Sequence, residues 1–398
     1  MYDTEDEAKE KKVRMDKNTN TIGNHPFWSK KMTGVLKTIA IVLMFIHHFF
    51  SIQMYLPADH SYSWAAFFEE YFTAPTKICV GIFAFITGYM YFFSKKKSFL
   101  NSVKSSGNLL VRYWVVAVPL IVLALLSGVY SFHLNHIVLE LFGIETNVMC
   151  FAWYVYFYVF LMFFLPLLIR ISKNRPGIML FLTFILFNFV SSLIYGLISN
   201  DLIRIKTVYS NCWGTLFPAV SGYVIARTGA FQKVKEKTDK IPSVLRYVLF
   251  LIFLCGAFML RYLFYNKLFT FTTIGVCKPG LAVNGDAVYV PVFVFCAVEL
   301  LSFLERTKAI RVFEILGKYS VYMWFWHCMF FDVLGKYTKR VLYAPKNPIL
   351  VLLWGIAVCV SLSVISDLTV KGLFSIKKNA SKKEALPVSS ESSSEKKD

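Results

Sequence analysis

The chain has 398 residues, of which 56% are hydrophobic and 17% are charged, with a formal net charge of +19. Soluble domains carry about a quarter charged residues, so this composition excludes an ordinary soluble protein and indicates an integral membrane protein. The excess of Lys and Arg does not indicate a nucleic-acid partner, because membrane proteins collect basic residues in their cytoplasmic loops. The expected partner is the lipid bilayer.

Ten apolar stretches are long enough to cross a bilayer, which takes ~20 residues. They predict an all-α polytopic membrane protein with about ten transmembrane helices, at 33–56, 75–94, 108–130, 150–172, 177–199, 209–228, 242–265, 286–304, 319–335 and 348–371. Residues 1–32 form a polar N-terminal tail with an interfacial segment and no apolar core typical of a signal peptide. Residues 33–371 form the transmembrane domain, and the Lys/Ser/Glu-rich residues 372–398 are expected to be a disordered tail.

The basic residues set the expected orientation. Most of the 43 Lys and Arg residues fall on the side of the predicted spans that holds both termini. The positive-inside rule then predicts a multi-pass protein of the cell membrane with cytoplasmic N- and C-termini. The eight cysteines show no C-x-x-C pair and no Cys/His cluster, so no metal site is predicted.

The first span contains an intramembrane lysine and two adjacent histidines, in LKTIAIVLMFIHH. Lys37 and His48 are separated by 11 residues, about three helical turns plus 20°, so they share one face with a rise of ~16 Å. His47 points ~100° away and is interpreted as structural. Ionisable residues inside a membrane are candidates for function, and a cation at the entry followed by a deep imidazole suits a phosphate-bearing donor with a reactive end. Snorkelling of Lys37 and a hydrogen-bonded core position for His48 are the alternatives.

Two further residues are candidates by the same argument. His327 lies about nine residues into the ninth predicted span among aromatic residues, where it either orients a site or is a packed, satisfied histidine. Arg112 opens the third predicted span after Lys95, Lys96 and Lys97. This basic group either attracts a polyanionic donor or reflects only the positive-inside rule.

Aromatic and acidic residues near the span ends allow two interpretations as well. Tyr62, Trp64, Trp153 and Tyr154 are expected near the outer side, where they stack on a sugar or form an interfacial aromatic belt. Glu299 falls near a cytoplasmic helix end, where a solvated carboxylate is expected.

The order of these motifs resembles the acyltransferase-3 family of multi-spanning membrane O-acyltransferases. LKTIAIVLMFIHH resembles the basic-residue-to-histidine motif of its first span, with Lys37 where Arg is commoner. VGIFAFITGYMYFF, VRYWVVAVP, FAWYVYFYVFLMFFLPLL and LGKYSVYMWFWH resemble its second, third, central and late spans, in that order. Many members carry a second Arg three residues before the position of Arg112, where this chain has Leu109.

The resemblance implies transfer of an acyl group, typically acetyl, from acyl-CoA (acetyl-CoA) to a sugar hydroxyl of a cell-surface or exported glycan. On that basis His48 is the expected general base or acyl carrier, His327 a second catalytic candidate, and Lys37 and Arg112 the ligands of the donor phosphates. No metal is implied. A transporter or flippase for a glycan or small solute, with no acyl chemistry, is the alternative, since such proteins also bury His and Lys.

Overall fold

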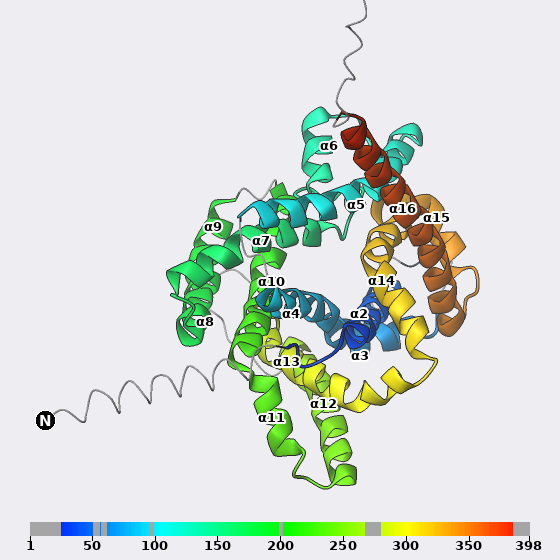
Figure 1. Cartoon of the computed structure of the whole chain (residues 1–398). Helices are drawn as coiled ribbons and strands as arrows, with labels where there is room; N and C mark the ends of the chain where they lie inside the picture. The colour runs from blue at the N-terminus through cyan, green and yellow to red at the C-terminus, as the bar shows by residue number, and fades with distance from the viewer. Residues whose placement is uncertain are drawn as a thin grey trace, which may run out of the picture.

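The computed structural model describes residues 25–50, 56, 62–94, 99–198, 202–266 and 280–384, and all regular structure in these ranges is helical. The larger helices are α2 (Lys30–Phe50), α3 (Ala65–Thr76), α4 (Ile78–Phe93), α5 (Phe99–Leu126), α6 (Leu134–Leu141), α7 (Trp153–Ile171), α8 (Pro176–Ile185), α9 (Ser191–Leu197), α10 (Ile203–Thr228), α11 (Ala230–Thr238), α12 (Ser243–Asn266), α13 (Gly280–Leu301), α14 (Ile310–Trp326), α15 (Asp332–Tyr343) and α16 (Pro348–Glu384). Figure 1 shows α2 and α4 near the middle of the assembly, with α11 and α12 at one edge and α8 and α9 at another.

Seven helical segments of the described chain are long and apolar enough to span a membrane, so the all-α membrane class is confirmed and the count of about ten is not. Three predicted spans account for the difference. The fifth, at 177–199, is divided into α8, a π-helical turn and α9. The ninth is divided between α14, which ends at Trp326, and the short helix α15. The sixth corresponds to α10, which is long but carries Arg204, Lys206 and several other polar residues.

The centre of the protein is the contact between α4 and α10, the most extensive helix pair. Gly88 makes it possible, because a Cβ at this position would lie 2.7 Å from the carbonyl carbon of Ala219. Small residues let membrane helices approach closely and gain van der Waals contact. Helix α4 is fixed in this way and presents its other face to α2.

Helix α2 crosses α14 in an equally close contact, which brings the first and the late histidine-bearing segments together. A Cβ on Gly317 would lie 2.7 Å from the Cα of Gly34, so the two backbones touch. The Thr38 hydroxyl also donates a hydrogen bond to the Phe313 carbonyl, at 2.8 Å. These contacts lie near the start of α2 and in the first half of α14, and they leave the later turns of both helices to form the site.

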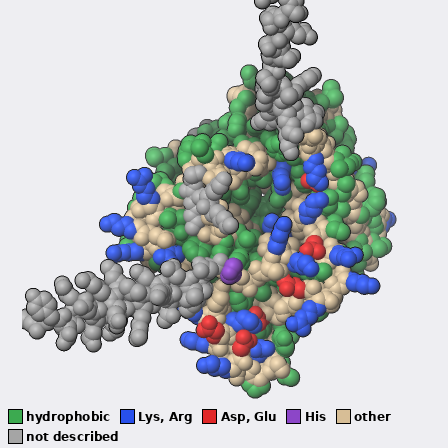
Figure 2. Space-filling view, viewed as in Figure 1, with side chains coloured by type: hydrophobic (Ala, Val, Ile, Leu, Met, Phe, Trp, Pro, Cys, Tyr) green, Lys and Arg blue, Asp and Glu red, His purple; other side chains and the backbone are tan. Residues whose placement is uncertain are grey.

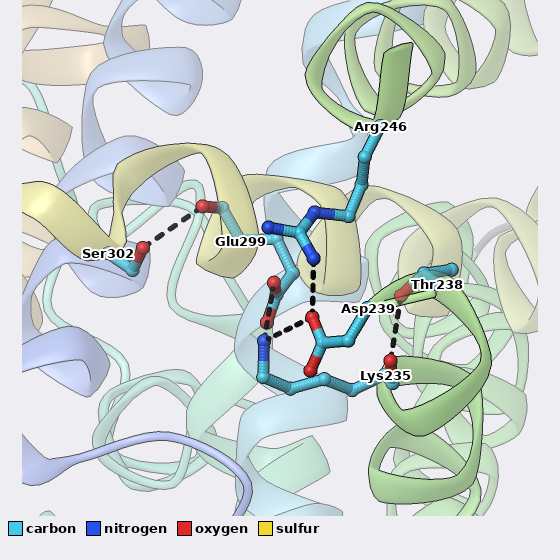
Figure 3. A network of polar contacts seen from close by, with 6 residues as sticks. All are labelled: Lys235, Thr238, Asp239, Arg246, Glu299 and Ser302. Carbon is cyan, nitrogen blue, oxygen red and sulfur yellow. Dashed lines mark hydrogen bonds and ion pairs between the residues drawn. The ribbon is translucent and has the colours of Figure 1, made fainter. Parts of the chain in front are cut away.

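A polar network fastens the α11–α12 hairpin to the end of α13 (Figure 3). The Lys235 ammonium lies 2.9 Å from a carboxylate oxygen of Glu299 and 3.2 Å from one of Asp239. Arg246 donates to Asp239 at 2.6 Å. Glu299 is buried and ion-paired, whereas the sequence suggested a solvated carboxylate.

Candidate active site

A cavity of about 690 Å³ lies between α2, α4, α5, α7 and α14. Its lining is polar along α5, with Asn101, Ser102, Ser105, Asn108 and Arg112. It is aromatic where α4, α7 and α14 meet, with Phe83, Tyr154, Tyr158, Trp324 and Phe325. Figure 2 shows a hollow on the face viewed, with Lys and Arg side chains around it. A cavity that combines basic and polar groups with an aromatic region suits an elongated molecule with an anionic head.

Three cations line this cavity: Lys30, Lys37 and Arg112. Lys37 and Arg112 come from different helices and are close enough to interact electrostatically. Arg112 also lies 5.9 Å from the ring centroid of Tyr322, on the α14 side. Two like charges from different helices that line one cavity favour an anion between them, and a phosphate is a common ligand of such a pair. Residues 95–97, the lysines expected beside Arg112, lie outside the described part of the chain.

The histidines of α2 and of the segment after α14 form a second group. The ring centroids of His48 and His327 are 5.2 Å apart, and His327 is fully buried. The Nδ1 of His327 is hydrogen-bonded to the Trp324 carbonyl, which only accepts, so this nitrogen carries the proton. Nε2 of His327 is therefore an acceptor, and among the described residues neither this atom nor Nδ1 of His48 has a hydrogen-bond partner, although both are buried.

The loop before α7 holds these two rings. The Phe151 ring stacks on His48, with centroids 3.7 Å apart, and on His327 at 5.1 Å. Its carbonyl accepts a hydrogen bond of 2.9 Å from Nε1 of Trp324. The loop itself is fixed by the buried carboxylate of Glu140, which accepts from the backbone N–H groups of residues 147, 148 and 149 at 2.6 to 3.0 Å.

His47 faces away from this pair, toward the point where α3 gives way to α4. Its Nδ1 lies 3.3 Å from the Thr76 hydroxyl. The neighbouring Ala74 carbonyl accepts a hydrogen bond from Arg261 of α12, which is itself paired with Asp286 of α13. Arg261 is 1% exposed and Asp286 4%.

Sequence reasoning missed this buried ion pair. Arg261 and Asp286 lie at the ends of predicted spans, where charged residues are normally solvated. Their opposite signs on consecutive predicted spans were the available signal, but only the packing of α12 on α13 shows that they meet.

The four predicted site residues thus form two groups. Lys37 and Arg112 line one cavity, and His48 and His327 lie together beyond its aromatic end. Among the described residues that line the cavity there is no histidine. Tyr154, expected at the outer side, also lines this cavity. The described residues contain no group of three or more His, Cys, Asp or Glu side chains arranged to hold a metal ion.

Comparison with known proteins agrees with the motif order. A family model described as an acyltransferase domain, Acyl_transf_3, matches residues 34–368. The matched range includes all four candidate site residues, Lys37, His48, Arg112 and His327. The searches of curated proteins and of solved structures find no match.

Proposed function

Since the chain belongs to the acyltransferase-3 family of membrane proteins, we propose that it transfers a short acyl group from acyl-CoA to a sugar hydroxyl of a cell-surface or exported glycan. The observation that carries the proposal is the arrangement of a cation-lined cavity directly beside a buried histidine pair. Acetyl-CoA from the cytosol is the proposed donor. The cell membrane is the proposed location, with both termini in the cytoplasm.

The cavity suits the donor by its charge distribution. Lys37 and Arg112 would bind the phosphates of coenzyme A, and the pantetheine arm would extend toward the aromatic end. Polar α5 residues such as Asn108 line the same cavity and offer further hydrogen bonds to the donor. A lysine binds phosphate as a point charge, whereas an arginine adds the bidentate geometry that Lys37 lacks.

The histidine pair suits the chemistry of the transfer. A hydroxyl is a weak nucleophile until a base removes its proton, and an imidazole with an unperturbed pKa near ~6.5 can do this at neutral pH. In the proposed step His48 takes the hydroxyl proton while the hydroxyl oxygen attacks the thioester carbon. The C–S bond then breaks, and the imidazolium returns the proton to the departing thiolate. In an alternative route His48 itself carries the acyl group before the hydroxyl attacks.

His327 suits a supporting role because its tautomer is fixed by the Trp324 carbonyl. Its free Nε2 would accept a hydrogen bond from the acceptor hydroxyl or from the His48 ring. Either contact would help to hold the acceptor hydroxyl at a defined distance from the thioester. Such positioning supplies a large share of the rate enhancement in reactions between two bound molecules.

The test is glycan acylation in cells that produce His48→Ala or, as the matched control, His47→Ala, with the amount of each protein in the membrane checked. We expect His48→Ala to abolish acylation and His47→Ala to retain most of it, because His47 faces Thr76 and not the pair. Full acylation with His48→Ala would refute the assignment. Solute binding by the purified wild-type protein without turnover of acyl-CoA would instead favour a transporter.

A further inference from the structure

The cavity ends at three aromatic side chains, each from a different helix. Phe83 of α4, Tyr154 of α7 and Trp324 of α14 all line it. The ring centroids of Trp324 lie 4.8 Å from Tyr154 and 5.1 Å from Phe83, so the three rings are in contact. On α14 the lining stops at Phe325, two residues before His327, and on α2 it stops at Lys37, three turns before His48. The three rings therefore lie at the end of the cavity that is toward the histidines.

Trp324 is the member of this group that also contacts the histidine site. Its backbone carbonyl accepts from Nδ1 of His327. Its Nε1 donates to the carbonyl of Phe151, whose ring stacks on His48. The side chain is 5% exposed, so its indole fills the space between the cavity and this ring stack. An acyl group that reaches His48 from the cavity must lie against this indole or take its place.

We infer that Trp324 determines the length of the acyl group that the protein accepts, an inference that rests on the proposed transfer from acyl-CoA. With the thioester at the aromatic end, the indole leaves room for a short acyl group and blocks additional methylenes. A rigid aromatic wall sets such a limit well, because a buried tryptophan has few alternative positions in a packed core. Removal of the ring would open the same space to longer chains.

The experiment measures release of free coenzyme A from acetyl-CoA, butyryl-CoA and octanoyl-CoA, followed with a thiol reagent. The assay uses washed membranes from cells that produce the full-length protein, and the glycans of these cells serve as the acceptor. Membranes from cells without the protein provide the blank. One methylene in a hydrophobic pocket is discriminated about 10-fold or more. We expect Trp324→Ala to raise the butyryl-to-acetyl rate ratio by at least about 10-fold over wild type.

Two variants separate the ring from its hydrogen bond and from a general effect of losing a tryptophan. Trp324→Phe keeps an aromatic ring at the end of the cavity but removes the N–H that donates to the Phe151 carbonyl. We expect this variant to release coenzyme A more slowly, with the butyryl-to-acetyl rate ratio of wild type. Trp326→Ala is the matched control. Its Nε1 donates to Ser366 of α16, away from the cavity, and its ratio is expected to equal that of wild type.

The inference is overturned if wild type releases coenzyme A and Trp324→Ala does the same with an unchanged ratio. If Trp324→Ala is inactive with every donor, Trp324→Leu replaces it and the same ratio decides. Absence of release by wild type from all three donors is a different result, because it contradicts the proposed function itself.

Discussion

The buried pair between Arg261 and Asp286 gives a prediction whose size follows from the structure. Two guanidinium nitrogens lie 2.8 and 3.1 Å from the two carboxylate oxygens, and a third nitrogen binds the Ala74 carbonyl. Both side chains are almost completely buried between α3, α12 and α13. Neither charge can be solvated when the other is removed, so each single substitution leaves an ion inside the bundle without its hydrogen-bonded partner.

Loss of one partner of such a pair costs about 3–5 kcal/mol, whereas replacement of both by apolar residues is close to neutral. Lys77 makes the two single substitutions unequal, because it interacts electrostatically with both groups. In Arg261→Met the Lys77 ammonium partly balances Asp286. In Asp286→Leu the like charges of Arg261 and Lys77 remain together without the carboxylate that balances them. We therefore expect Asp286→Leu to destabilise more than Arg261→Met, and the double variant to destabilise least.

The measurement is the free energy of unfolding from SDS titration of the purified proteins in detergent micelles. Wild type, the two single variants and the double variant form a double-mutant cycle, which isolates the interaction between the two side chains. A double variant that loses as much as the two single variants together would refute the reasoning, since it would show that the two charges do not compensate each other. Single losses below about 1 kcal/mol would refute the burial argument, because that is the cost of an exposed pair.

Two further predictions concern the donor and the loop beside the histidines. Arg112→Met is expected to raise the KM for acyl-CoA about 10- to 100-fold with little change in kcat, because one charge-assisted hydrogen bond is lost. Lys37→Arg keeps the charge, so its KM is expected to stay near that of wild type. An unchanged KM for Arg112→Met would mean that the phosphates bind elsewhere. Burial raises the pKa of Glu140 from 4.5 to about 7, with a smaller contribution from nearby Glu145, while the three backbone N–H groups oppose the shift. Because its pKa is higher in the folded state, the Glu140 carboxyl binds its proton more tightly there than in the unfolded chain. This contribution to the free energy of unfolding is full below pH 4.5 and disappears as the pH rises to about 7. Relative to the always neutral Glu140→Gln, wild type is expected to lose about 3 kcal/mol of unfolding free energy over that range, and a difference independent of pH would contradict this.

The sequence predicted the helical membrane class because long apolar runs are a strong local signal. The predicted count of about ten spans is not confirmed, because long apolar stretches do not show where a helix is interrupted. The stretch at 177–199 is apolar throughout, but a π-helical turn breaks it in the middle. The ninth predicted span ran past the end of α14, because the apolar residues that follow His327 leave the helix in a short 3-10 turn.

For the candidate site the sequence offers four residues, and the structure shows how they are arranged. Helical spacing placed Lys37 and His48 on one face, and the motif order added Arg112 and His327. The separation into a cation group and a histidine group depends on Trp324 and Phe151, whose roles come from contacts between helices distant in sequence. The Glu140 carboxylate was missed for the same reason, since its partners are the backbone of a loop.

The aromatic end of the cavity has a consequence for the membrane as an electrical insulator. A protein with a wet cavity on one face and buried polar groups beyond it risks a continuous path for protons and ions. Phe83, Tyr154 and Trp324 are in ring contact between the cavity and the histidines in the described structure, and apolar constrictions of this kind oppose a continuous water column. The same three rings that line the proposed donor site would thus keep the protein from discharging the potential across the bilayer.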